Sequence, residues 1–243
     1  MAYKKLQFKI KLSQKDITNG LKLPNKLSLG LAYLCGILVG DGSIYQRKKK
    51  HDYVIKCVGN PRDEKELYYN VIGPYFKKIF GFVPNIKNQD SDTTFGFVIY
   101  SKNLFTYLTE IIGLSHGKKE QQLEIPQIFK EYKPLLISFV RGVFDTDGCV
   151  CFKRKYKSVP YYPVISVSSK SKKLIIELAE ILKKLGFKIV ETYDYKRIDK
   201  RIEKGFTVIN NIELNGTENL RKWISIINFY SPKHLKKINK YGK

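Results

Sequence analysis

The chain has 243 residues, of which 43% are hydrophobic, and this composition is typical of a globular protein of one large or two small domains. The longest apolar stretch, residues 27–39, is too short to cross a membrane, and no signal peptide pattern precedes it. Lysine and arginine outnumber aspartate and glutamate by 45 to 22, which gives a net charge of +23. A folded protein this basic usually has a polyanionic partner, and we expect nucleic acid rather than a membrane surface.

The predicted elements occur in the same order twice along the chain. A basic arm (residues 1–27) comes first. An apolar helix (29–39), a strand (43–50), a second strand (53–58), an amphipathic helix (67–79), a hairpin (85–87 with 94–100) and a closing helix (103–112) follow. The equivalent elements of the second copy are expected at 134–144, 149–156, 164–168, 174–182, 188–192 with 207–214, and 218–227. We therefore predict an internal duplication with domains at 28–132 and 133–243 and an insertion at 193–205.

Small residues recur at helical spacing in the two apolar helices. Gly36 and Gly40 lie on one face of the first helix, and Gly142 and Thr146 occupy the equivalent places in the second. Because small side chains let two backbones approach closely, we expect these helices to pack together.

An Asp-Gly pair follows each apolar helix, at Asp41 and Asp147. Packing of the two helices brings these aspartates together, where neighbouring carboxylates repel each other and are disfavoured at a helix C-terminus. A divalent cation held by oxygen ligands removes both problems, and Mg²⁺ suits such a site. Four cysteines without a CxxC pair and only three histidines, which are expected in loops, argue against zinc and favour a reducing intracellular setting, cytoplasmic or organellar.

The segments LCGILVGDG (residues 34–42) and VRGVFDTDG (140–148) resemble the signature motifs of the LAGLIDADG homing endonucleases, in the monomeric form with two motifs. The resemblance covers about residues 28–243 and implies an α+β fold of two pseudo-symmetric αββαββα domains with saddle-shaped antiparallel sheets. The eighth motif position is acidic in both copies, whereas the sixth is Val39 in one and Asp145 in the other. Asp145 is therefore expected to be a capping or structural group.

The same resemblance implies a site-specific enzyme that makes a Mg²⁺-dependent double-strand break in a long DNA target and leaves short 3′ overhangs, with Mn²⁺ as a substitute metal. Asp41 and Asp147, with the carbonyls of Gly40 and Thr146, would hold the metal. Family active sites often use a late lysine in each half, which here points to Lys119 and Lys233, with Lys118 and Lys237 as rivals. A polar residue that often ends the second strand matches Ser169 in the second copy, but the first copy has Val58-Gly59 there.

Strand alternation predicts which side chains face DNA. If Ile44 and Val150 face the core, alternate residues of the same strands and of their neighbours face the opposite side. The DNA-contacting residues predicted in this way are Arg47, Lys49, Lys56, Lys87, Lys153, Lys155, Ser166 and Lys188.

Two other functions remain open at this point. An RNA maturase that assists intron splicing could use the same scaffold with intron RNA as its partner, and a non-catalytic DNA-binding regulator could use the same basic surface. Retention of both aspartates argues against the regulator, because a pure binder gains nothing from negative charge near phosphate. The ends of the chain lack nucleophilic splicing residues, so we expect an intron-encoded enzyme rather than an intein.

Overall fold

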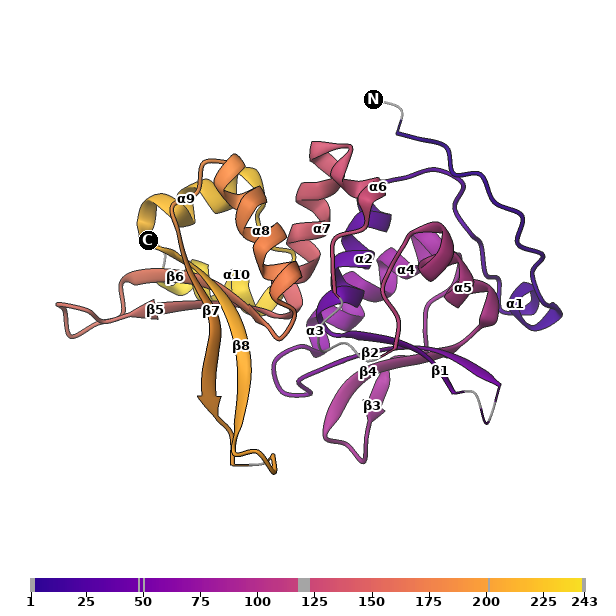
Figure 1. Cartoon of the computed structure of the whole chain (residues 1–243), viewed down its shortest axis with the longest axis horizontal. Helices are drawn as coiled ribbons and strands as arrows, with labels where there is room; N and C mark the ends of the chain where they lie inside the picture. The colour runs from indigo at the N-terminus through magenta and orange to yellow at the C-terminus, as the bar shows by residue number, and fades with distance from the viewer. Residues whose placement is uncertain (1–2, 48, 50, 118–122, 201, 242–243) are drawn as a thin grey trace.

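The computed structural model describes residues 3–47, 49, 51–117, 123–200 and 202–241 (Figure 1). It contains two four-stranded antiparallel sheets with strand orders β1-β2-β4-β3 and β5-β6-β8-β7, so the two halves have the same topology. The predicted α+β class with a repeated αββαββα arrangement is confirmed. In the described part of the chain, no helix is long and apolar enough to span a membrane.

The first half begins with a short helix in the N-terminal arm and ends with a helix packed beside β2. Its elements are α1 (Gln14–Thr18), α2 (Leu29–Gly40), β1 (Gly42–Arg47), β2 (Asp52–Gly59), α3 (Lys65–Leu67), a π-helical stretch (Tyr68–Ile72), α4 (Gly73–Phe80), β3 (Lys87–Gln89), β4 (Thr94–Tyr100), α5 (Lys102–Thr106) and a second π-helical stretch (Tyr107–Ile111).

The second half repeats this order with longer outer strands and one additional helix at its end. Its elements are α6 (Gln127–Lys130), α7 (Lys133–Thr146), β5 (Gly148–Lys153), β6 (Tyr162–Ser169), α8 (Lys172–Lys184), β7 (Ile189–Ile198), β8 (Phe206–Asn215), α9 (Thr217–Ile226) and α10 (Pro232–Tyr241). In Figure 1, α2 and α7 lie side by side between the two sheets.

The first strand of each half is shorter than predicted. β1 ends at Arg47 because β2 pairs back with it from Asp52, and His51 in the connecting turn has a left-handed backbone (φ 53°). β5 ends at Lys153, and the turn that follows contains Lys155 with φ 43°. Lys49 and Lys155 therefore lie in turns, and the alternation that was expected to orient them does not extend that far.

The extra residues of the second copy lengthen a hairpin instead of forming a separate insertion. β7 and β8 stay paired from Ile189–Leu214 out to Ile198–Phe206, with a bulge between Thr192 and Tyr195. In Figure 1 the two long strands of this hairpin run down to the lower edge of the molecule.

The N-terminal arm packs on the first half. Leu6, Leu21 and Leu27 are buried in the core. The Tyr107 hydroxyl donates to the carbonyl of Pro24 (2.8 Å), and the Asn103 amide donates to the carbonyl of Lys11 (2.9 Å). These contacts make the arm part of the first half's core instead of a free basic tail.

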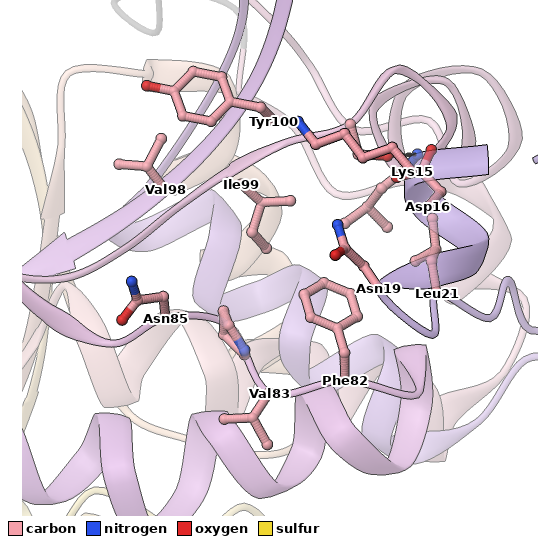
Figure 2. A pocket seen from close by; sticks show the side chains of 13 residues that line it. Lys15, Asp16, Asn19, Leu21, Phe82, Val83, Asn85, Val98, Ile99 and Tyr100 are labelled. Carbon is pink, nitrogen blue, oxygen red and sulfur yellow. Dashed lines mark hydrogen bonds between the residues drawn. The ribbon is translucent and has the colours of Figure 1, made fainter. Parts of the chain in front are cut away.

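A hollow of about 330 Å³ lies between α1, residues 82–85 and the far end of β4. It forms because β3 has only three residues and pairs with β4 only as far as Gly96. Figure 2 shows Asn19 and Leu21 from the arm, Phe82 and Val83 from the loop, and Ile99 from β4 around this hollow.

Candidate active site at the ends of the central helices

The two central helices touch through their glycines. A Cβ atom built on Gly36 would lie 2.1 Å from the carbonyl oxygen of Phe139 and 3.0 Å from Cα of Gly142. A Cβ on Gly142 would lie 2.3 Å from the carbonyl oxygen of Tyr33. A side chain at either position would overlap the backbone of the other helix, so glycine is required for this close approach. The helix packing expected from the sequence is confirmed.

The close approach continues to the ends of the helices. A Cβ on Gly40 would lie 2.0 Å from Oγ1 of Thr146 and 3.6 Å from the carboxyl carbon of Asp147. Asp41 and Asp147 are the C-cap residues of α2 and α7, and their backbone N–H groups donate to the carbonyls of Ile37 and Val143, each at 3.0 Å. The Asp147 carboxyl of the second half thus lies against Gly40, the residue that precedes Asp41 in the first half.

These residues offer the donor set that a hard divalent cation prefers. Asp41 and Asp147 carry carboxylate oxygens, and the main chain of Gly40 and Thr146 ends the two helices, where carbonyls point along the axis. The absent side chain of Gly40 leaves the space in which the Thr146 hydroxyl lies, and the Asp147 carboxyl is in van der Waals contact with the same space. Within the described ranges no cluster of three or more His, Cys, Asp or Glu side chains can hold a metal. The residues fit a cation bound by two carboxylates, carbonyls and water.

An acid to which the sequence patterns assign no role lies beside Asp41. A Cβ on Gly59 would lie 1.8 Å from Oε2 of Glu64 and 3.1 Å from Oδ2 of Asp41. Glu64 is only 5% exposed, accepts a hydrogen bond from the N–H of Asn60 (2.6 Å) and forms an ion pair with Lys233. Lys233 is predicted at the site from the sequence, but its partner Glu64 is not. The sequence holds one signal for Glu64: Gly59 has no side chain at the position where the other copy has Ser169.

Asp145 is buried among donors. It accepts hydrogen bonds from the Tyr33 hydroxyl (2.8 Å) and from the N–H groups of Tyr230 (3.0 Å) and Ser231 (3.1 Å). Burial is the main cause that raises the pKa of Asp145 to about 6, and these hydrogen bonds oppose the rise. Because the carboxylate is fully enclosed and contacts main-chain N–H groups, Asp145 has the structural role expected of it.

The comparisons with known proteins agree with this fold. Residues 134–228 match the LAGLIDADG-like domain family. The homing endonuclease I-DmoI, solved in complex with DNA and Ca, is 17% identical, and the superposition covers 88% of this chain and 98% of that chain with a TM-score of 0.58. The LAGLIDADG homing endonuclease I-LtrWI, bound to its target DNA, is 12% identical over 86% of this chain and 87% of that chain, with a TM-score of 0.50.

The chain has the LAGLIDADG homing endonuclease fold. Similar I-DmoI structures were solved with DNA and Mn, and with target DNA in the presence of Mg.

Three curated relatives come from Methanocaldococcus jannaschii. An uncharacterized protein is 27% identical over 78% of this chain, which spans 66% of that relative. A glutamine–fructose-6-phosphate aminotransferase and a probable translation initiation factor are 22% and 28% identical, and the chain spans 18% and 16% of their lengths. Segments similar to this LAGLIDADG-fold chain therefore lie within much larger proteins.

Within the LAGLIDADG fold, the strand register separates two faces of each sheet. Ile44 and Val150 are buried against the helices, so their strand neighbours face away from the core. The predicted DNA contacts on these open faces are Arg47, Lys56, Lys87, Lys153 and Ser166. Lys188 lies immediately before β7, Lys49 and Lys155 lie in turns, and Lys118 and Lys119 fall outside the described residues.

Several of these cations have acidic neighbours that the sequence analysis did not include. Arg47 lies 2.8 Å from Asp52, and the Lys56 ammonium lies 2.6 Å from Asp90. Lys188 lies 3.0 Å from Glu218. Such surface pairs contribute little to stability, so a phosphate can replace the carboxylate at low cost.

Proposed function

We propose that this chain is a monomeric, site-specific DNA endonuclease that makes a metal-dependent double-strand break with short 3′ overhangs. The observation that carries the proposal is the pairing of two equivalent aspartates, Asp41 and Asp147, at the ends of two helices in backbone contact. Each of the two proposed domains, residues 28–132 and 133–243, contributes one acid. A duplex has two strands, and a pseudo-symmetric site with one acid per half is suited to cutting both.

The residues of the site have distinct proposed roles. Asp41 and Asp147, with the carbonyls of Gly40 and Thr146, would hold Mg²⁺, for which Mn²⁺ can substitute. A metal held by these residues would supply an activated water and would stabilise the leaving 3′ oxygen. Lys233, and Lys119 in the other half, would place positive charge near the scissile phosphates, where negative charge increases in the transition state.

The open sheet faces are the proposed DNA-binding surfaces. Their basic side chains would contact phosphates and base edges on both half-sites. We propose Arg47, Lys49, Lys56, Lys87, Lys153, Lys155, Ser166 and Lys188 for this role. An intron-encoded enzyme that acts on the intron-free form of its host gene is the biological setting we infer.

Cleavage of intron-free DNA from the organism that encodes the protein tests this function. The protein is incubated with that DNA and Mg²⁺, the fragment ends are sequenced, and EDTA replaces Mg²⁺ in the control. One recurrent cut with short 3′ overhangs that EDTA abolishes is the expected result. Tight duplex binding with no cut would identify a regulator instead. Weak duplex binding with preference for intron RNA at matched salt would identify a maturase.

A further inference from the structure

The two halves differ at the end of the second strand of each sheet. Gly42 pairs with Cys57, and Gly148 pairs with Val167, so Gly59 in β2 is equivalent to Ser169 in β6. Gly59 has no side chain, and the Glu64 carboxylate occupies the space in which one would lie. A buried acid from the following segment thus takes the place next to Asp41 that corresponds in register to the Ser169 side chain of the other half.

Glu64 joins the two halves of the molecule at this point. Its other carboxylate oxygen pairs with the ammonium of Lys233, which comes from α10 in the second half. The Lys233 side chain is 21% exposed and that of Glu64 is 7% exposed. An ion pair this enclosed fixes both side chains, whereas an exposed lysine samples many rotamers.

The main chain that carries Lys233 is anchored separately. Asp145 accepts the N–H groups of Tyr230 and Ser231 immediately before α10 begins at Pro232. Lys233 is therefore held at both ends, with its backbone fixed through Asp145 and its ammonium fixed through Glu64.

The second half has no acid at the corresponding place. Ser171 is the N-cap of α8, as Glu64 is the N-cap of α3, and its hydroxyl donates to the carbonyl of Leu123 (2.8 Å). Leu123 follows the segment that contains Lys119. The carboxylate of Glu64 thus contacts Lys233 of the second half, and the hydroxyl of Ser171 contacts Leu123 near the end of the first half.

We propose that Glu64 is a positioning residue that holds Lys233 at the Asp41 end of the site, so that the two strands are cut with different requirements. This inference rests on the proposed endonuclease function. Glu64 is too enclosed to contact DNA and acts through Lys233. Loss of Glu64 slows cleavage at the Asp41 end, while the Asp147 end, which does not use Glu64, keeps its rate.

A supercoiled plasmid that carries one copy of the wild-type cleavage site tests the inference. Glu64→Gln removes the negative charge and keeps the shape, Glu64→Asp retains the charge, and Lys233→Met removes the cation. Glu66→Gln is the matched control, because Glu66 also joins α3 to α10, through Lys236, but on the exposed surface. DNA affinity is measured in Ca²⁺, and unfolding is measured for every variant.

Glu64→Gln is expected to slow one strand at least tenfold, so that nicked circles accumulate with the same strand cut in every molecule. Lys233→Met gives the same pattern, the double variant is no slower than Lys233→Met, Glu64→Asp recovers part of the rate, and Glu66→Gln cuts as the wild type does. DNA affinity stays within about twofold. In ¹⁵N-labelled protein without metal, a slowly exchanging ammonium signal assigned to Lys233 is lost in Glu64→Gln.

The outcomes separate the inference from the function on which it rests. A wild-type protein that cuts no DNA refutes the endonuclease function and the inference with it. A wild-type protein that cuts, combined with Glu64→Gln cutting both strands at the wild-type rate, overturns the inference alone. Equal slowing of both strands in Glu64→Gln, in step with lost stability, would show that Glu64 is only structural.

Discussion

Replacement of Gly36 by alanine should separate the central helices. The added Cβ would lie 2.1 Å from the Phe139 carbonyl oxygen, where carbon–oxygen contacts normally exceed 3 Å. The obstacle is backbone, which no rotamer change can remove. The two helices must therefore move apart by about 1 Å at this crossing.

The cost follows from two opposing effects. Overpacking in a well-packed core costs about 1–3 kcal/mol, and a clash with backbone belongs at the upper end. Alanine gains about 1 kcal/mol over glycine as a helix former. The net loss in the free energy of unfolding is about 2 kcal/mol, which lowers the Tm by roughly 4–8 °C in a chain of this size. Because Asp41 and Asp147 end these helices, cleavage should fall about 100-fold, as expected when reacting groups are misplaced by 1 Å.

Thermal unfolding and plasmid cleavage of the variant measure both effects. Gly30→Ala is the control, because Gly30 lies in the same helix but its added Cβ would meet only side-chain atoms of Ile79 and Tyr75, at 3.0 and 3.2 Å. Those side chains can shift, so Gly30→Ala should lose much less stability and should cut DNA at the wild-type rate. If Gly36→Ala unfolds and cuts as the control does, the backbone contact between α2 and α7 is not what sets the spacing of the aspartates.

Three further predictions concern buried titratable groups and salt. Burial lowers the pKa of His234 to about 3, so acidification from pH 6.5 destabilises the fold. Between pH 7 and pH 5 the free energy of unfolding, measured in urea, should fall about 2 kcal/mol less in His234→Leu than in the wild type. An equal fall in the two proteins would contradict this. For Asp145 the sign is reversed: its raised pKa makes it stabilise the fold more as pH falls from 6 to 4. Asp145→Asn should therefore cost about 1–3 kcal/mol at pH 7.5 and up to about 3 kcal/mol more at pH 4, whereas a deficit that shrinks on acidification would be evidence against this assignment. If eight phosphates are neutralised, the logarithm of the DNA affinity should fall against the logarithm of salt with a slope of about −7, and a slope near zero would rule out phosphate contacts as the source of affinity.

The features predicted from the sequence are those that a short-range pattern determines. Helical spacing of Gly36 with Gly40 and of Gly142 with Thr146 was enough to predict that the helices pack, and the repeat was enough to predict two equivalent halves. Strand ends were less predictable. Alternation carries no information on where a hairpin turns, so β5 was extended through Lys155, which lies in a turn with positive φ.

Long-range contacts account for what the sequence analysis missed. Nothing in the sequence assigns Glu64 a role, because its partner Lys233 is 169 residues away. His234 is expected in a loop because the lysine-rich composition of its segment hides the amphipathic pattern of a helix. In the structure it is fully buried in α10 and packs against Phe229. The arm before residue 28 had no clear pattern, although it completes the first core.

Strand cleavage by Asp41→Asn and Asp147→Asn, measured on the wild-type target with DNA affinity determined in Ca²⁺, tests directly whether these two aspartates are the catalytic acids. Each substitution should abolish double-strand cleavage or slow it by several orders of magnitude, while affinity for the duplex is retained or increased. Unchanged cutting by either variant would contradict the assignment of these two aspartates as the metal-binding acids of one shared site.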